Sequence, residues 1–367
     1  MESIVFLGKG GIGKSTISSN MSVILAAKGR KVLHIGCDPK MDSVISLMGR
    51  HIPPFTSDGI FGGEAALLKS VHRSPIKGVS CIEAGGPLPG MGCAGTGIGA
   101  MLDAMKEASL LEKGGYDAAV FDVLGDVVCA GFAAPLRSGF ARKAVIVVSE
   151  ELLSLFAANK LILMLNNYSR NGVYLAGLVV NTKNEKTLKP VQDFAKAVNT
   201  RILATIFRSD AVVRAEKAQK PVVLYEPKSE AASQLVRLCA AVESAQPPES
   251  APESLNERDF PALFSGNLPA AAARDRRPAA KGGKVKLPGE VHRLMETAGL
   301  NFLGIASSQL LFTFRSDGRE LKVLIMHKDN SREGMFCIND WAMCTAPGES
   351  EEARALYDQA RREGRVA

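Results

Sequence analysis

The stretch GKGGIGKST, Gly8 to Thr16, follows a short apolar run and precedes a segment with helical spacing. It fits the pattern G-x4-G-K-[ST], and its place between a strand and a helix supports a phosphate-binding loop. Glycines let backbone N–H groups turn toward phosphates, and the helix N-terminus adds partial positive charge. We expect Lys14 to bridge the β- and γ-phosphates and the Ser15 hydroxyl to ligate Mg²⁺. The predicted nucleotide-binding residues of this loop are Gly8, Lys9, Gly10, Gly11, Ile12, Gly13, Lys14, Ser15 and Thr16.

Short β-branched runs alternate with amphipathic segments as far as about residue 245. This alternation predicts an α/β domain, a P-loop NTPase whose mostly parallel sheet is flanked by helices. The expected strands are 4–7, 31–35, 79–84, 118–122, 144–148, 175–180 and 202–206. The expected helices are 15–28, 98–112, 152–166 and 230–243.

The composition changes after this first domain, which we place at residues 1–245. Residues 246–288 are rich in Pro, Ala, Ser and charge, which is typical of a linker with too little apolar surface to order itself. Residues 289–367 predict a small α+β domain of unknown role, with a hairpin around Asp317-Gly318 and helices at 290–298 and 349–362.

The overall composition excludes several classes of protein. No run approaches the roughly 18 apolar residues of a membrane span, and the amino terminus lacks the layout of a signal peptide, so we expect a cytoplasmic protein without a membrane partner. The net charge of +7 includes a basic segment at 274–286. Aromatic residues make up 6% and do not alternate with basic ones, so we interpret the segment as a solvated linker and expect no specific nucleic-acid partner.

Acidic residues follow two of the expected strands. Asp38, after the second strand, is a candidate for positioning the attacking water or the metal, and Lys40 and Asp42 are candidates for nucleotide contacts in the same turn. Asp122 ends the apolar run AAVFD and is expected to hold Mg²⁺ directly or through water. Asp126 follows in the next turn and is expected to orient the hydrolytic water.

Two of the seven cysteines lie beside nucleotide-binding elements. Cys93 lies in GGPLPGMGCAG, and Cys129 follows Asp122 by seven residues. A cubane iron–sulfur cluster usually takes four thiolates, so two cysteines per chain require a symmetric dimer. We expect no disulfide framework, since seven is an odd number. Small buried hydrophobes are the expected role of Cys37, Cys81 and Cys239, and a metal role for Cys337 and Cys344 is the less favoured interpretation.

Four segments together resemble the nitrogenase iron protein family over about residues 1–243: GKGGIGKST, GCDPKMDS, GGPLPGMGCAG and DVLGDVVCAGF. That group includes the ATP-dependent reductase subunits of dark-operative protochlorophyllide reductase, chlorophyllide reductase, the nickel-tetrapyrrole cyclase of coenzyme F430 synthesis and methylthio-alkane reductase. The resemblance implies a homodimer with one [4Fe–4S] cluster between the chains, ligated by Cys93 and Cys129 of each. It also implies that MgATP hydrolysis controls one-electron transfer to a nitrogenase-like catalytic protein, with ferredoxin or flavodoxin as the electron donor.

The resemblance implies roles for further residues. Lys9 is similar to the extra lysine of the deviant Walker A ATPases, which reaches across to the nucleotide of the partner chain. Asn181, Arg208 and Asp210 match positions that contact or close over the base. Thr96 departs from the family, which has arginine there on its docking face, and this argues against an ordinary nitrogenase partner. The chain from about residue 245 onward has no counterpart that we recognise in the family.

Two other kinds of ATPase share the loop at Gly8–Thr16. A positioning ATPase of the MinD/ParA type has no use for Cys93 and Cys129 in these settings. Its membrane form also needs a terminal amphipathic helix, whereas this chain ends in the highly charged segment ESEEARALYDQARREGRVA. An iron–sulfur assembly ATPase of the same group would show a close C-x-x-C pair, which this chain lacks.

Overall fold

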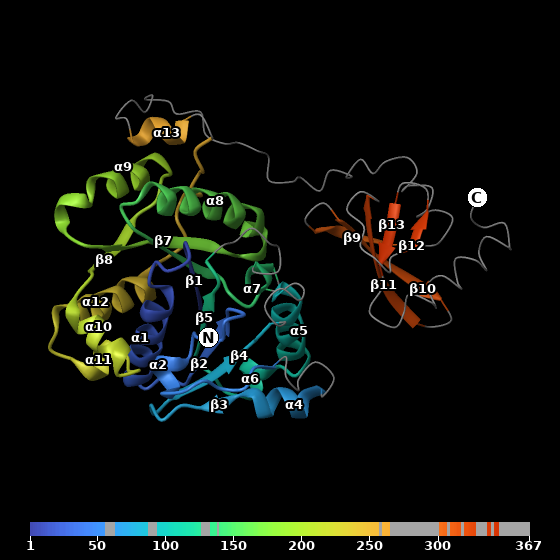
Figure 1. Cartoon of the computed structure of the whole chain (residues 1–367), viewed down its shortest axis with the longest axis horizontal. Helices are drawn as coiled ribbons and strands as arrows, with labels where there is room; N and C mark the ends of the chain where they lie inside the picture. Colours follow the sequence, from blue (N-terminus) through green and yellow to red (C-terminus); the bar gives the residue numbers. More distant parts are fainter. Residues whose placement is uncertain are drawn as a thin grey trace. The chain divides into compact units, whose positions relative to one another are not determined.

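A computed structural model describes residues 1–55, 63–86, 94–125, 133–137, 139–256 and 259–264, and the strands 301–306, 309–316, 319–327, 336–338 and 341–344. Contacts divide the chain into two compact units, Met1–Ala280 and Lys281–Ala367 (Figure 1). Each unit contains its own sheet.

The first unit contains an eight-stranded sheet with the order β3-β4-β2-β5-β1-β6-β7-β8. All neighbouring strands pair in parallel except β3 with β4, which confirms the predicted α/β fold with a mostly parallel sheet. The strands are β1 (Glu2–Leu7), β2 (Val32–Cys37), β3 (His72–Arg73), β4 (Val79–Glu83), β5 (Ala118–Val123), β6 (Lys143–Val148), β7 (Tyr174–Thr182) and β8 (Ile202–Phe207).

Helices flank this sheet. They are α1 (Lys14–Ala27), α2 (Ile45–Met48), α4 (Gly63–Ser70), α5 (Ala94–Glu107), α6 (Leu110–Lys113), α7 (Ala134–Arg137), α8 (Leu152–Tyr168), α9 (Lys189–Ala197), α10 (Asp210–Lys217), α11 (Val222–Tyr225), α12 (Glu230–Ser244) and α13 (Asp259–Phe264), with short 3₁₀ turns at Ser169–Asn171 and Glu185–Thr187. The single helix expected at 98–112 is divided into α5 and α6, because Ser109 adopts a left-handed conformation with φ of 49°.

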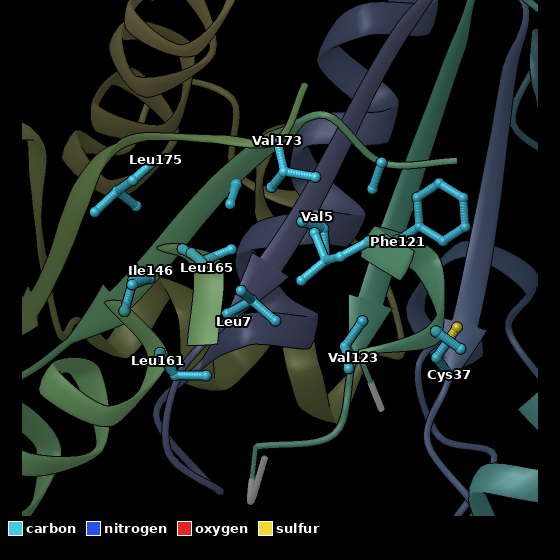
Figure 2. Packing of buried hydrophobic residues seen from close by; sticks show 14 of the residues in the cluster. Val5, Leu7, Cys37, Phe121, Val123, Ile146, Leu161, Leu165, Val173 and Leu175 are labelled. Carbon is cyan, nitrogen blue, oxygen red and sulfur yellow. The ribbon is translucent and has the colours of Figure 1, made fainter. Parts of the chain in front are cut away.

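The central strand β1 shows why the sheet is covered on both faces. Val5 and Leu7 join one buried cluster, in which Figure 2 shows them near Phe121 of β5 and Leu161 of α8. Ile4 and Phe6 join a second cluster, which includes apolar residues of α1 and α12. Since successive side chains of a strand point to opposite faces, an uninterrupted apolar strand requires helices on both sides.

Residues after α12 also pack against this unit. Leu255, Phe260 and Leu263 are buried in the same cluster as α8 and α9. The side chain of Asn159 accepts a hydrogen bond from the Leu255 amide at 2.7 Å and donates one to its carbonyl at 2.7 Å. This part of the segment that we expected to be a linker therefore belongs to the first unit, because three spaced apolar side chains hold it in place.

The second unit contains a five-stranded sheet with the order β12-β13-β11-β10-β9. Its strands are β9 (Asn301–Ala306), β10 (Gln309–Ser316), β11 (Arg319–His327), β12 (Phe336–Ile338) and β13 (Trp341–Cys344), and their pairs are antiparallel. The pairing of Ser316 with Arg319 confirms the predicted hairpin between β10 and β11. The helices expected at 290–298 and 349–362 lie outside the described residues.

Within the described part of the chain, no helix is both long and apolar enough to cross a membrane.

The buried ammonium of Lys143 joins the start of β1 to the end of α12. It contacts a Glu2 carboxylate oxygen at 2.7 Å and donates to the carbonyls of Val242 and Glu243 at 2.7 and 3.2 Å. Lys143→Met preserves the volume but removes all three hydrogen bonds, so we expect the free energy of unfolding to fall by about 2–4 kcal/mol. Urea unfolding measures this change.

An exposed ion pair gives the matched control. Lys189 and Asp193 lie 2.8 Å apart, with their side chains 81% and 38% exposed. Lys189→Met should change stability by less than about 1 kcal/mol. Equal losses in the two variants would show that the Lys143 contacts do not stabilise the fold.

Candidate nucleotide and metal site

The loop between β1 and α1 needs glycine at two positions. Gly8 has φ of 142°, and a Cβ there would lie 2.4 Å from the carbonyl oxygen of Val147. Gly13 has φ of 98°, and a Cβ there would lie 2.6 Å from Nδ2 of Asn181. Side chains are excluded at both positions, so the backbone can turn its N–H groups inward as a phosphate-binding loop does.

Two predicted binding residues make contacts within this loop. The buried ammonium of Lys14 donates to the carbonyl oxygen of Lys9 at 3.1 Å, across the turn. The Asn181 amide, at the end of β7, donates to the carbonyl oxygen of Ile12 at 2.8 Å. The structure therefore brings Asn181, 169 residues after Ile12 in the sequence, to the loop that contains Lys14.

The carboxylate of Asp122 is buried close to the loop. It is 2% exposed, and neither oxygen has a hydrogen-bond partner among the described residues. Burial raises the pKa of Asp122 to about 6, and the nearby hydroxyls of Ser15 and Ser43 and the charge of Lys14 act in the opposite direction. The buried Ser43 hydroxyl is also without a hydrogen-bond partner. An unpartnered buried carboxylate needs a cation or donor, so this site is a candidate for a metal.

The donor set fits Mg²⁺. Ser15 and Asp122 offer the hard oxygen ligands that Mg²⁺ prefers, and Mg²⁺ in such sites keeps waters and binds substrate phosphates. In the described residues, no group of three or more His, Cys, Asp or Glu side chains could hold a metal ion. One carboxylate and one hydroxyl are suited to a Mg²⁺ ion whose remaining ligands are phosphate oxygens and water molecules.

The turn after β2 places Asp38 beside the same site. Its Oδ1 accepts a hydrogen bond from the Lys40 amide at 2.9 Å, and the Lys40 ammonium lies 3.6 Å from Oδ2. Burial raises the pKa of Asp38, and Lys40 and Lys14 partly offset this. Lys40 and Asp42 are exposed, so the turn presents them to solvent above a buried Asp38.

The segment that follows Asp122 runs directly over the phosphate-binding loop. A Cβ on Gly125 would lie 2.3 Å from the amide nitrogen of Gly10 and 2.6 Å from the carbonyl carbon of Lys9. The loop and the segment leading toward Asp126 and Cys129 are therefore in van der Waals contact. The close approach leaves no room for a side chain between them.

This contact predicts a strong effect of Gly125→Ala. The added methyl group must displace backbone atoms of the loop, so we expect the affinity for MgATP to fall at least about tenfold, a cost above about 1.4 kcal/mol. Isothermal titration calorimetry checks this result. Gly99→Ala is the matched control, because no atom lies within 4 Å of a Cβ on Gly99, and it should bind MgATP as the unaltered chain does. Equal affinity in Gly125→Ala would contradict the close contact.

Residues predicted to approach the base lie where β8 leads into α10. Arg208 and Asp210 are exposed, and the Arg208 amide donates to the carbonyl oxygen of Thr182 at 2.9 Å. The Thr16 hydroxyl donates to Glu216 of α10 at 2.9 Å, which joins the phosphate-binding helix to this region. A pocket of about 160 Å³ between them is lined by residues that include Ser15, Thr16, Asp42, Ser43 and Glu216.

Several predicted site residues lie outside the described residues, namely Cys93, Asp126 and Cys129. Their positions stay predictions. Thr96 falls within α5. The structure confirms that Cys37, Cys81 and Cys239 are buried free thiols, and burial raises the pKa of Cys239 to about 12. Cys337 and Cys344 lie in β12 and β13 of the second unit.

One carboxylate of the site was missed in the sequence. Glu83 ends β4 and is fully buried, and burial together with nearby carboxylates raises the pKa of its side chain well above the ordinary value. The signal was available, because VSCIE ends an apolar strand with an acid in the same way that AAVFD ends with Asp122.

Comparison with known families decides what kind of protein carries this site. Residues 2–268 match the profile of the 4Fe-4S iron sulfur cluster binding proteins, NifH/frxC family. The chain belongs to this family. The match extends past residue 245, so the expectation that the family resemblance ends there is wrong, and the segment packed on α8 and α9 is part of the family region.

Curated relatives agree with membership of the NifH/frxC family. The chain is 43% identical over 235 residues to the nitrogenase iron protein of Methanospirillum hungatei, covering 62% of this chain and 83% of the relative. It is 38% identical over 234 residues to nitrogenase iron protein 2 of Paenibacillus durus, covering 63% of this chain and 80% of the relative.

Solved structures show the fold that this NifH/frxC member shares with other ATPases. The cell division ATPase MinD of Pyrococcus furiosus matches with a TM-score of 0.54 and 21% identity, covering 67% of this chain and 99% of that chain. Cobyrinic acid a,c-diamide synthase of Mycobacterium smegmatis matches with a TM-score of 0.51 and 18% identity, covering 68% of this chain and all of that chain. At these identities the likeness concerns the fold alone. The P-loop NTPase fold is thereby confirmed.

Proposed function

We propose that the chain is an ATP-dependent reductase component, a homodimer that couples MgATP hydrolysis to one-electron transfer toward a nitrogenase-like catalytic protein. The observation that carries this proposal is the buried, unpartnered carboxylate of Asp122, at the start of a segment that contacts the phosphate-binding loop at Gly125. The same segment continues to Cys129. Membership of a family of 4Fe-4S cluster binding proteins supports a role for Cys129 as a cluster ligand.

The nucleotide site works through the chain's own residues. Loop amides between Gly8 and Ser15 and the ammonium of Lys14 hold the phosphates, and Lys9 reaches toward the nucleotide of the partner chain. Ser15 and Asp122 would hold Mg²⁺, which supplies neutralising charge at the β- and γ-phosphates. Asp38 and Asp126 position the attacking water. Asn181, Arg208 and Asp210 are the proposed contacts of the base, and the exposed Lys40 and Asp42 are further proposed contacts of the nucleotide.

The thiols of Cys93 and Cys129 are the proposed ligands of the [4Fe–4S] cluster, two from each chain of the dimer. When bound, the cluster supplies one-electron redox chemistry. Movement of the loop against Gly125 then changes the position of Cys129 through three intervening residues. This route connects hydrolysis to the exposure of the cluster and to docking.

The partners follow from the same proposal. The electron acceptor is a nitrogenase-like catalytic protein, and the donor is a ferredoxin or flavodoxin. Thr96, where the resemblance predicts an arginine on the docking face, favours a partner other than an ordinary nitrogenase.

Anaerobic purification tests this function. We expect a brown dimer with about four iron atoms and four sulfides per two chains. A colourless chain that stays free of iron after anaerobic reconstitution would rule out the proposal, and a monomer with a full cluster would rule out the sharing of ligands between chains.

A further inference from the structure

The carboxylates of Glu83 and Asp122 lie in one row of the sheet. Strand register pairs Glu83 of β4 with Gly36 of β2, and pairs Gly36 with Asp122 of β5. Residues opposite each other on neighbouring strands point to the same face. Both carboxylates therefore lie on one face, with Gly36 between them.

Gly36 makes room for the Glu83 side chain. A Cβ at this position would lie 1.9 Å from Oε2 of Glu83 and 2.4 Å from its Cδ. The carboxyl group thus lies against the backbone of β2, where only glycine allows it. The close fit against Gly36 fixes the Glu83 carboxyl group within the row and leaves little room for other rotamers.

The carboxyl group of Glu83 also holds the segment that starts at Asp38. Its Oε1 accepts a hydrogen bond from the Val44 amide at 3.1 Å, at the start of α2. Its Oε2 has no hydrogen-bond partner among the described residues. Burial and the charges of Asp122, Asp42 and Asp38 raise the pKa of Glu83, so the group interacts with the acids of the nucleotide site.

Glu83 is also the last residue of β4, ten residues before Cys93. We propose that Glu83 is a positioning residue that transmits movement of the Asp38–Val44 segment to β4 and so to the chain leading to Cys93. Each cysteine proposed as a cluster ligand then has its own strand and its own carboxylate, Asp122 on β5 for Cys129 and Glu83 on β4 for Cys93. The inference rests on the proposed ATP coupling and adds a second route to it.

Hydrogen exchange separates the two routes in the anaerobically purified full-length dimer. Peptides spanning 84–100 and 123–135 are compared with and without MgATP. In the unaltered chain, MgATP should slow or speed exchange in both peptides. In Glu83→Ala, the response of 84–100 should be lost and that of 123–135 retained. Glu83→Gln should preserve both responses, because its amide oxygen can accept the hydrogen bond from Val44.

Two further variants complete the test. Cys81→Ala removes a buried atom from the same strand without touching the carboxyl group, and should preserve both responses. If Glu83→Ala fails to fold, Glu83→Asp withdraws the carboxyl group by one methylene and should lose the 84–100 response alone. A retained 84–100 response in Glu83→Ala or Glu83→Asp, or its loss in Glu83→Gln, would overturn the inference. Absence of both responses in the unaltered chain would instead contradict the ATP coupling itself, and with it the second route.

Discussion

Asp122→Asn is expected to lower MgATP hydrolysis at least about 100-fold while raising the thermal stability of the chain measured without nucleotide. The loss of activity follows because an amide cannot replace the carboxylate charge beside the metal. The gain in stability follows because burial raises the pKa of Asp122 from 3.8 to about 6, so the ionised group is unfavourable in the folded chain.

The stability gain of Asp122→Asn should depend on pH, because it comes from the ionisation of Asp122. Between pH 4 and 6 the folded chain binds a proton at Asp122 that the unfolded chain releases, so the penalty develops as the pH rises through this window. Above pH 6 the free-energy cost of keeping Asp122 ionised in the folded chain reaches its full value of about 2–3 kcal/mol. The stability advantage of Asp122→Asn should therefore be largest at pH 7 and shrink as the pH falls toward 4.5. An advantage that does not change with pH would contradict the buried, ionised Asp122.

Cys93→Ala and Cys129→Ala are each expected to abolish cluster binding, with a fall from about four iron atoms per dimer to none. One substitution removes two of four ligands, because the proposed site takes the same cysteine from both chains. The nucleotide loop is formed by other residues, so MgATP binding should persist. Iron analysis and calorimetry measure the two properties.

Cys239→Ala supplies the matched control for the cluster variants. Its thiol is buried within α12, in the apolar cluster of α1 and β1. This variant should keep the full iron content. Iron loss in Cys239→Ala, or a full cluster in Cys129→Ala, would contradict the ligand assignment.

The sequence predicted the features that depend on local spacing. Gly8, Gly13 and Lys14 belong to one continuous motif. The contacts of its loop follow from the strand before it and the helix after it. The parallel strands were predictable because strands buried on both faces appear in the sequence as nearly continuous apolar runs. Their ends differ from expectation by a few residues, as for β7, which begins at Tyr174.

Other features depend on contacts that are distant in sequence. The role of Glu83 becomes visible only when register places Gly36 between it and Asp122. The docking of Leu255 depends on Asn159, 96 residues earlier, within a segment whose composition resembles a linker. The break at Ser109 is a single left-handed residue, which periodicity does not reveal.

The most direct test of the coupling is the rate at which a ferrous chelator captures iron from the anaerobic dimer, with and without MgATP. We expect MgATP to change this rate at least about tenfold, which is a change of about 1.4 kcal/mol or more in the activation free energy. We expect no such change in Lys14→Ala, whose phosphate-binding ammonium is absent. An identical rate with and without MgATP, in a dimer that binds the nucleotide and holds its cluster, would contradict the coupling.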